Sequence, residues 1–431
     1  MKRSIIIFIM LFAAIFSASS QTAIGLGDCY NAALMNHSLK DEKQQLGKIW
    51  EMKDRNVVSG WYPSMEAGAN ITYNTSVADL ASALESIPVQ GITDNIGGMP
   101  HDQYKLTLDI QQVIWDGGVI KGNRELEKRS LLVKEQEVEA ELYKIKEQVN
   151  NSFFGLIILS KQEELLRTYL EIIDERIKDI ESAIENGFLL SSDRDKLRAE
   201  GIRIEQQLSE SAIRISSVRS ILSDITGYDL TSGTEPVLPD ISIESTAGIT
   251  RPELNALDLK QDQLEAGKSI IKSSRMPKAF GFATLGYGNP PGNDFFNDSF
   301  GPYAVLGAGV RWNIYDWSKS KRDRQIIDIN KDILSSRKTE MEDNLIRALE
   351  NKQAEILALG SMLDSDRELI ELRQTITRST ESLFKNGAIT ATEYLAELNA
   401  EKQAVINYEL HQISHIRAKV DYLNIAGKDI E

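Results

Sequence analysis

The sequence predicts a mainly α-helical protein with a smaller β part, in which one structural unit is present twice. Two observations indicate the duplication: Asn186-Gly187 recurs as Asn386-Gly387, and Ile114-Trp115-Asp116 recurs as Ile314-Tyr315-Asp316, in both cases about 200 residues later. Short solenoid repeats have periods of roughly 20 to 50 residues. A period this long therefore indicates two copies of a whole architecture within the 431 residues.

The composition excludes some classes of protein. With 26% charged and 42% hydrophobic residues, the chain has the composition of a folded protein rather than a disordered one. Its formal net charge of -15, with no local basic stripe, argues against nucleic acid as a partner, because phosphate backbones attract clusters of Lys and Arg. Cys29 is the only cysteine, so the chain has no intrachain disulfide.

Residues 1–20 have the pattern of a signal peptide for export. Lys2 and Arg3 precede an apolar stretch from Ser4 to Phe16, and small residues up to Ser20 follow it. The alternative, an uncleaved anchor, is disfavoured because this stretch is too short to span a bilayer comfortably. No later apolar run has the length of a membrane-spanning helix, so an exported chain that enters a membrane has to cross it as strands.

The first repeat, expected over residues 21–250, has the order helix, strand, strand, very long helix, turn, return helix. Alternating apolar and polar residues predict the strands, and longer apolar periodicities predict the helices. The longest helix contains no proline and would extend roughly 100 Å at 1.5 Å per residue. The expected elements are helices over 26–59, 119–185 and 192–226, strands over 65–75 and 104–114, and a polar linker over 228–250.

The second repeat, expected over residues 251–431, has the same order. Its first strand is the least regular of the four, because Phe280 and Phe282 lie on the face that is polar in the others. The expected elements are helices over 252–275, 317–385 and 391–426, and strands over 278–288 and 303–314.

The four strands have the length and alternation of transmembrane barrel strands. Because four strands cannot close a barrel, and open edges are not tolerated in hydrocarbon, we expect several copies of the chain to pool their strands. Aromatic residues near the strand ends would suit the two interfacial belts of a membrane, although ordinary strand packing is the alternative. These residues are Tyr73, Tyr104, Trp115, Tyr287, Tyr303, Trp312 and Tyr315.

The order of elements, the duplication and the strand-ending motifs, Ile114 to Gly118 and Ile314 to Ser318, together resemble the TolC family of outer membrane efflux proteins. The resemblance covers essentially the whole mature chain. It implies a homotrimer with a 12-stranded transmembrane β-barrel, four strands per chain, in the outer membrane lipid of a Gram-negative bacterium. A 12-helix periplasmic α-barrel with coiled-coil packing would continue it.

The same resemblance implies a function. The chain would be the passive exit duct of a tripartite efflux system, receiving solutes from a periplasmic adaptor (membrane fusion) protein and an inner-membrane pump of the RND or ABC type. A duct for polypeptides in a type I secretion system is an alternative within the same fold. An exported coiled-coil structural protein is an alternative of another class, and the four strands argue against it.

Acidic residues of such families line the periplasmic aperture, after the turn of the second repeat. Glu393 matches one such position, whereas the other falls on Ala396, with Glu397 adjacent. Asp193 is the counterpart of Glu393 in the first repeat. The alternative role for Glu393 is structural, since Thr390 followed three residues later by Glu393 is a capping box.

The turns between the long helices and the return helices would form the tips that meet the adaptor. Plain turn chemistry is the alternative, but an exposed Phe188 and Leu189 favour docking. The candidate docking residues are Asn186, Gly187, Phe188, Asn386, Gly387 and Ala388.

The remaining polar motifs have simpler interpretations. Asp116 and Asp316 are expected to cap helices at their N-termini. His411 and His415 lie four apart on a helix, but the glutamate of a zinc-protease motif is absent, so no metal site is expected. With no P-loop and no G-x-G-x-x-G, we expect no cofactor and no enzymatic activity.

Overall fold

The computed structural model describes residues 22–77, 99–187, 189–230, 234–243, 248–294 and 297–430. The predicted signal peptide and Phe188 lie outside these ranges. The chain forms two compact units. Unit 1 comprises Met1–Lys43, Gln136–Ala256 and Lys338–Glu431, and unit 2 comprises Gln44–Glu135 and Leu257–Arg337. Each unit therefore takes elements from both repeats.

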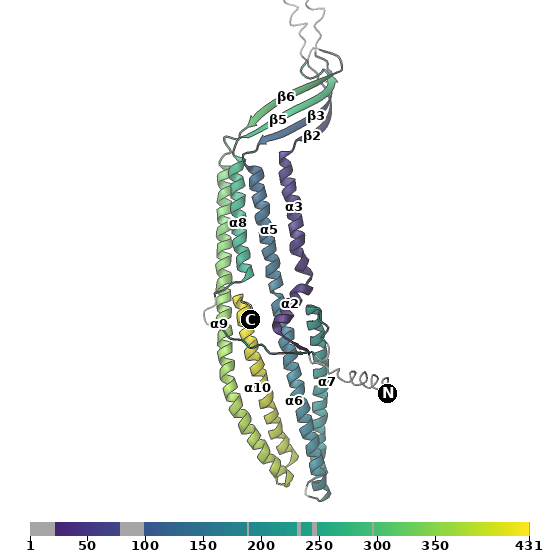
Figure 1. Cartoon of the computed structure of the whole chain (residues 1–431), viewed down its shortest axis with the longest axis vertical. Helices are drawn as coiled ribbons and strands as arrows, with labels where there is room; N and C mark the ends of the chain where they lie inside the picture. Colours follow the sequence, from purple (N-terminus) through teal and green to yellow (C-terminus); the bar gives the residue numbers. More distant parts are fainter. Residues whose placement is uncertain are drawn as a thin grey trace, which may run out of the picture. The chain divides into compact units, whose positions relative to one another are not determined.

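Unit 2 contains a four-stranded antiparallel sheet (Figure 1). Its order is β2 (Ser64–Tyr73), β3 (Asp102–Trp115), β5 (Lys278–Asn289) and β6 (Gly301–Arg311). The central pairing of β3 with β5 joins the two repeats, and β2 and β6 are the edges. The sheet therefore exists only because both copies of the repeat contribute two strands each.

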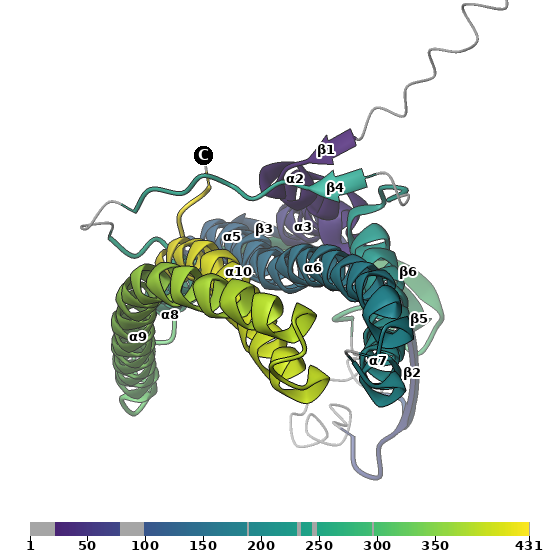
Figure 2. The same cartoon turned by 90° about the horizontal axis from the view of Figure 1, so that it is seen from below.

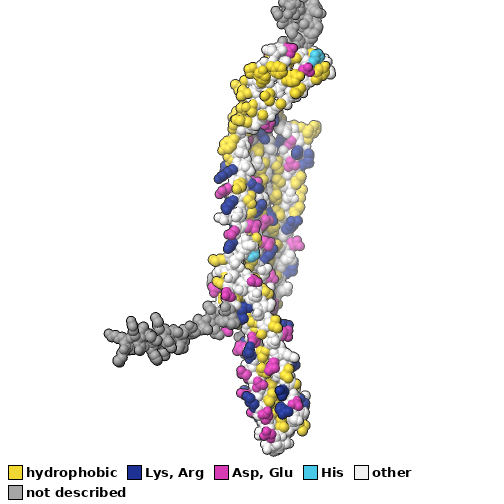
Figure 3. All heavy atoms as spheres, turned by 90° about the vertical axis from the view of Figure 1, so that its right-hand side faces the viewer, with side chains coloured by type: hydrophobic (Ala, Val, Ile, Leu, Met, Phe, Trp, Pro, Cys, Tyr) yellow, Lys and Arg dark blue, Asp and Glu magenta, His cyan; other side chains and the backbone are white. Residues whose placement is uncertain are grey.

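One face of the sheet is apolar and exposed. Leu108 lies opposite Ala67 on β2 and Leu285 on β5, and Leu306 on β6 lies opposite Ala283. Most side chains on this face are exposed in the single chain, and 78% of the surface of Leu306 is accessible. Figure 3 shows hydrophobic side chains gathered over the sheet. The residues that share this face are Met65, Ala67, Ala69, Ile71 and Tyr73 on β2, Tyr104, Leu106, Leu108 and Ile110 on β3, Ala283, Leu285 and Tyr287 on β5, and Ala304, Leu306, Ala308 and Val310 on β6.

The opposite face explains the irregular strand of the second repeat. The ring of Phe282 lies over Gly307 of the neighbouring strand, where an added Cβ would be 2.4 Å from the ring. Phe280 lies over Gly309 in the same way, at 2.8 Å. Two aromatic residues on the more polar face are thus accommodated by glycines directly across the strand pair.

The first helical segment of the chain differs from the sequence prediction. The predicted helix over 26–59 is divided into α2 (Leu26–Asn36), the 3₁₀ turns η1 (Ser38–Asp41) and η2 (Ser59–Trp61), and α3 (Glu42–Val58). The break falls at His37, whose backbone is extended and whose Nδ1 accepts a hydrogen bond from the Leu39 amide. A side chain that competes for a backbone amide ends the first helix here.

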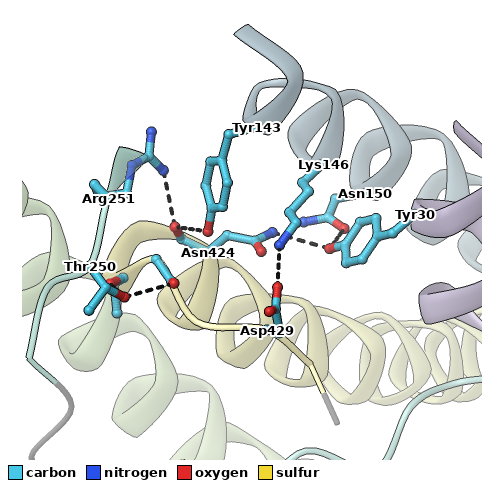
Figure 4. Close-up of polar contacts among 10 residues, drawn as sticks. Tyr30, Tyr143, Lys146, Asn150, Thr250, Arg251, Asn424 and Asp429 are labelled. Atoms are coloured by element: carbon cyan, nitrogen blue, oxygen red, sulfur yellow. Dashed lines mark hydrogen bonds and ion pairs between the residues drawn. The ribbon is translucent and has the colours of Figure 1, made fainter. Parts of the chain in front are cut away.

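The predicted single helix over 119–185 is also interrupted, at Lys144, between α5 (Val119–Tyr143) and α6 (Ile145–Glu185). The residues on either side of the break form polar contacts with residues near the C-terminus (Figure 4). Tyr143 donates a hydrogen bond to the Asn424 carbonyl (2.9 Å), and Lys146 pairs with Asp429 (2.7 Å). The corresponding helix of the second repeat, α9 (Lys319–Lys385), is continuous.

The two aspartates predicted as N-caps do bind amides at the helix starts, but each lies three residues before the first helical residue, Val119 or Lys319. Asp116 accepts hydrogen bonds from the amides of Gly118 and Ile120, and Asp316 accepts one from the Ser320 amide. The first repeat places Gly117 and Gly118 in the left-handed region, at φ 75° and 93°. Trp317 and Ser318 adopt the same conformation in the second repeat, at φ 53° and 59°, where non-glycine residues are uncommon.

Unit 1 is built on two helical hairpins. The helix α7 (Ser191–Thr226) returns along α6, and α10 (Ala391–Ala426) follows α9 after the second turn. The predicted linker over 228–250 is not wholly irregular, because β4 (Thr234–Pro236) pairs in parallel with β1 (Thr22–Ile24), as Figure 2 shows. The helix α8 (Pro252–Ser274) follows this linker. None of the described helices is both long and apolar enough to cross a membrane.

The N-terminal end of α2 is packed into unit 1. Cys29 is fully buried, and burial raises the pKa of its thiol to about 12. The Tyr30 hydroxyl donates to Asn150 Oδ1 (2.5 Å) and accepts from Asn424 Nδ2 (3.2 Å), which ties α2 to α6 and α10 (Figure 4). The only cysteine of the sequence is therefore an unreactive core residue.

Candidate functional site

The two turns at the ends of the hairpins have the same local structure. Asn186 and Asn386 each donate a side-chain hydrogen bond of 2.7 Å to the carbonyl four residues earlier, on Ser182 and Ser382. Gly187 and Gly387 follow in the left-handed conformation, at φ 78° and 71°. Glycine is the residue that ends helices in this way at little cost. The duplicated Asn-Gly motif thus encodes two equivalent helix ends.

The residues after the turns only partly match the sequence expectation. Leu189, expected to be exposed, is buried, with 9% of its surface accessible, whereas Leu190 is 69% exposed. Leu189 belongs to a hydrophobic cluster in which the rings of Phe384 and Tyr394 stack, with centroids 5.2 Å apart. Leu189 therefore belongs to the core of the tip, whereas Leu190 is one of its exposed apolar residues.

Glu393 has the geometry of a capping residue and is also exposed. Its carboxylate accepts hydrogen bonds from the Thr390 amide (2.9 Å) and hydroxyl (3.0 Å), while the Thr390 hydroxyl accepts one from the Glu393 amide (3.3 Å). These bonds from Thr390 lower the pKa of the Glu393 carboxyl below its usual range. The side chain thus carries a negative charge in water at the start of α10.

Asp193 does not share this environment. It is 6% exposed, and its carboxylate accepts hydrogen bonds from the amides of Leu190 and, across the two hairpins, Ala391 (3.3 Å each). Lys196 lies 3.6 Å away as an ion-pair partner. Asp193 therefore satisfies two amides at the starts of α7 and α10.

Glu397 lies one turn after Glu393, with a partner of its own. Its carboxylate accepts a hydrogen bond from Arg373 Nη1 at 3.0 Å, and each side chain of the pair is 35% exposed. The structure thus separates the three acidic candidates: Glu393 is exposed and without a cationic partner among the described residues, Glu397 is paired, and Asp193 is buried.

Four charged residues near the tips form a cluster that the sequence patterns did not predict. Arg176 of α6 pairs with Asp179 (2.6 Å) and with Glu381 of α9 (2.7 Å), and Lys385 pairs with the same two carboxylates (3.2 and 3.1 Å). The spacings of three and four within each helix were visible in the sequence. The contacts between helices were not, because they join residues more than 200 positions apart.

The two histidines do not form a joint site. His411 Nδ1 lies 2.7 Å from Asp366 Oδ2, while burial and the nearby Lys419 lower the pKa of His415. Within the described ranges, no group of three or more His, Cys, Asp or Glu side chains is placed to hold a metal.

Solved structures share this architecture over almost the whole chain. The match to CusC, studied for transmembrane channel formation, has a TM-score of 0.71 at 12% identity and covers 94% of this chain and 92% of CusC. The outer membrane protein VceC of Vibrio cholerae matches with a TM-score of 0.68 at 14% identity, over 94% of this chain and 97% of VceC. For the CmeC outer membrane channel of Campylobacter jejuni the values are 0.65, 14%, 93% and 85%. The chain has the fold of these outer membrane channels.

This outer membrane channel fold confirms the predicted fold class, mainly α with a β part formed by strands from both repeats. Sequence comparison alone does not identify this fold, because no family model and no curated protein matches the chain.

Proposed function

We propose that this chain is the outer membrane channel of a tripartite efflux system in a Gram-negative bacterium, with most of its residues in the periplasm. The exposed apolar face of the four-stranded sheet carries the proposal. Leu306, Ile71 and Val310 are 78%, 75% and 72% exposed on that face. A sheet with this much apolar surface requires an apolar environment, and a bilayer provides one.

The edges of the sheet support an oligomer. Among the described residues, one side of β2 and one side of β6 have no neighbouring strand, and unpaired backbone groups are not tolerated in hydrocarbon. Pairing β6 of one copy with β2 of the next satisfies them. Three copies would give the 12-stranded barrel that the resemblance to the TolC family implies.

A second exposed surface, on α9 in unit 1, supports the same oligomer. Met362, Leu369, Ile376 and Leu383 are spaced by seven residues and are 42% to 50% exposed. This spacing is that of a coiled-coil seam. We propose that helices of neighbouring copies cover it.

At the tips, Glu393 is the aperture residue we propose, because it is exposed, ionised and free of a cationic partner among the described residues. Asp193 contributes the packing of the two hairpins. The Asn-Gly turns, with Phe188 and Ala388, would meet the adaptor, and the pump would supply the energy and most of the selectivity.

The mass of the protein particle, measured after extraction from purified outer membranes in mild detergent, tests the proposal. Three chains per particle, together with conductance in a planar bilayer, are expected. A monomer, or recovery from the soluble periplasm, would overturn the proposal and favour a coiled-coil structural protein instead. Passage of polypeptides but not small solutes would favour the duct of a type I secretion system.

A further inference from the structure

Unit 2 contains a cavity of about 670 Å³ beside the ends of two strands. Trp61 lies three residues before the first residue of β2, and Gly118 lies three residues after the last residue of β3. Under the proposed function, the cavity is thus at the level where the strands leave the hydrocarbon on the periplasmic side. It is lined by Trp50, Asp54 and Trp61 from α3 and η2, by Gly118 just before α5, by Ile120, Lys121, Gly122, Arg124, Glu125 and Lys128 from the start of α5, and by Ser269 and Ser273 from α8.

The charge of the lining is positive once its ion pairs are counted. Arg124 binds Asp54 through two hydrogen bonds, of 2.7 and 2.9 Å, and Glu125 pairs with Arg129 at 2.7 Å. Lys121 and Lys128 remain, both exposed and neither with an ion-pair partner in the described part of the chain. Seven residues apart on one helix, they share a face and lie about 10 Å from each other along its axis. The cavity therefore presents two uncompensated cations.

The other lining residues suit the head region of a lipid. Trp and Tyr are the residues that favour the membrane–water interface, because the indole combines an apolar body with a polar tip. Trp50 also has a buried Nε1 for which the described residues provide no acceptor. The hydroxyls of Ser269 and Ser273 complete a lining that combines apolar rings, donors and positive charge.

The second repeat provides an internal comparison, because two of the lining positions carry different residues there. Counting 200 residues on, Gly122 corresponds to Arg322 and Lys128 to Asp328. Gly122 allows α5 to approach α8 closely, since an added Cβ would lie 2.9 Å from Ile270. Asp328 pairs with Lys268 instead (2.6 Å). The repeated architecture therefore does not by itself place a glycine and a second lysine at these two positions.

We infer that this cavity binds the phosphate of an anionic phospholipid from the periplasmic leaflet, with Lys121 and Lys128 as the cations that recognise it. The inference rests on the proposed function, because it requires the strands to lie in a bilayer. The acyl chains would remain among the lipids that surround the apolar face of the sheet. An anionic headgroup gains charge-assisted hydrogen bonds here that a zwitterionic headgroup gains only in part.

The experiment measures lipid retained by the full-length protein. The particle is extracted in mild detergent, delipidated, and incubated with nanodiscs or mixed micelles containing phosphatidylglycerol or phosphatidylcholine, and bound lipid is counted by native mass spectrometry. The wild type should retain phosphatidylglycerol in preference. The double variant Lys121→Gln, Lys128→Gln should bind it about 30-fold more weakly, since each lysine near an anionic surface contributes about fivefold and the two factors multiply.

Three controls give each outcome a meaning. Lys321→Gln removes the lysine that corresponds to Lys121 in the second repeat and should leave retention unchanged. Lys121→Arg with Lys128→Arg should retain the lipid. Inorganic phosphate alone should compete only weakly. Equal retention of both lipids, full retention by the double variant, or equally strong competition by inorganic phosphate would overturn the inference. A conducting trimer would still stand in those cases, whereas a monomer without conductance would be a failure of the proposed function itself.

Discussion

At the scale of single residues, the clearest difference between the repeats is the turn that leads from each second strand into its long helix. Gly117 and Gly118 adopt left-handed conformations in one repeat, and Trp317 and Ser318 do so in the other. For residues with a Cβ this conformation costs roughly 1–2 kcal/mol each. Hydrogen bonds hold the second turn in place, from Ser320 to Asp316 and from Arg322 to the Trp317 carbonyl.

We therefore expect Ser318→Gly to raise the free energy of unfolding by about 1 kcal/mol, because glycine removes the backbone strain and the Asp316 cap remains. Gly117→Ala should do the opposite, since its Cβ would lie 2.6 Å from Cβ of Met276 at a φ of 75°. Denaturant unfolding followed by circular dichroism measures both changes. A destabilised Ser318→Gly variant would show that the turn is not strained.

The charge and the capping function of Glu393 are separable by one substitution. Glutamine also forms capping boxes, so Glu393→Gln should keep α10 intact while lowering cation preference in single-channel recordings. Hydrogen bonds from Thr390 place the folded-state pKa of Glu393 below its ordinary value of 4.5. The stabilisation by its ionised form is thus complete above pH 4.5 and is lost as the pH falls through the lower, folded-state value.

The wild-type preference for cations should therefore persist below pH 4.5 before it declines, and the Glu393→Gln channel should lack that pH-dependent component. Reversal potentials in a salt gradient measure it. Unchanged selectivity in the variant would leave capping as the only role of this residue.

At the scale of elements, the sequence pattern predicted the positions of the strands closely but did not predict the breaks between helices. Strand alternation is local, so the pattern around Ile71 or Leu106 is sufficient to place β2 and β3. The break at Lys144 depends on contacts with Asn424 and Asp429, almost 300 residues further on. The pairing of β1 with β4 likewise joins residues more than 200 positions apart. Such contacts have no signature in a local pattern.

The polar contacts around Tyr30 make this long-range anchoring testable. Tyr30→Phe removes the donor to Asn150 and the acceptor of Asn424, and leaves both amides unsatisfied in a buried place. We expect the free energy of unfolding to fall by about 1–3 kcal/mol. Tyr228→Phe is the matched control, because Tyr228 is 44% exposed and its hydroxyl has no hydrogen bond among the described residues. Equal stability of the two variants would contradict a structural role for the Tyr30 hydroxyl.

At the scale of the whole molecule, the duplication was the most informative property of the sequence, and it still left the candidate site incomplete. The shift of 200 residues equates Asp193 with Glu393, yet one is buried between the hairpins and the other is exposed. The difference arises because Asp193 accepts a hydrogen bond from an amide of the opposite hairpin. The repeat pattern does not predict such a contact, because the contact joins one copy of the repeat to the other. The fold class was predictable from order and period, whereas the roles of equivalent residues depend on which neighbours each copy meets.

The exposed apolar face of the sheet allows a direct test of the proposed assembly. Leu306 and Val305 are adjacent on β6 and lie on opposite faces, and Leu306 is 78% exposed in the single chain. If that face met water, Leu306→Arg would cost little. In a bilayer, arginine on the lipid face costs about 2–4 kcal/mol near the midplane, whereas the inner face of a barrel tolerates charge. We expect Leu306→Arg to reduce the yield of assembled trimer in outer membranes and in refolding into lipid vesicles, and Val305→Arg to assemble more efficiently. Assembly of both variants at wild-type levels would mean that the apolar face does not contact lipid, and the proposed channel would be wrong.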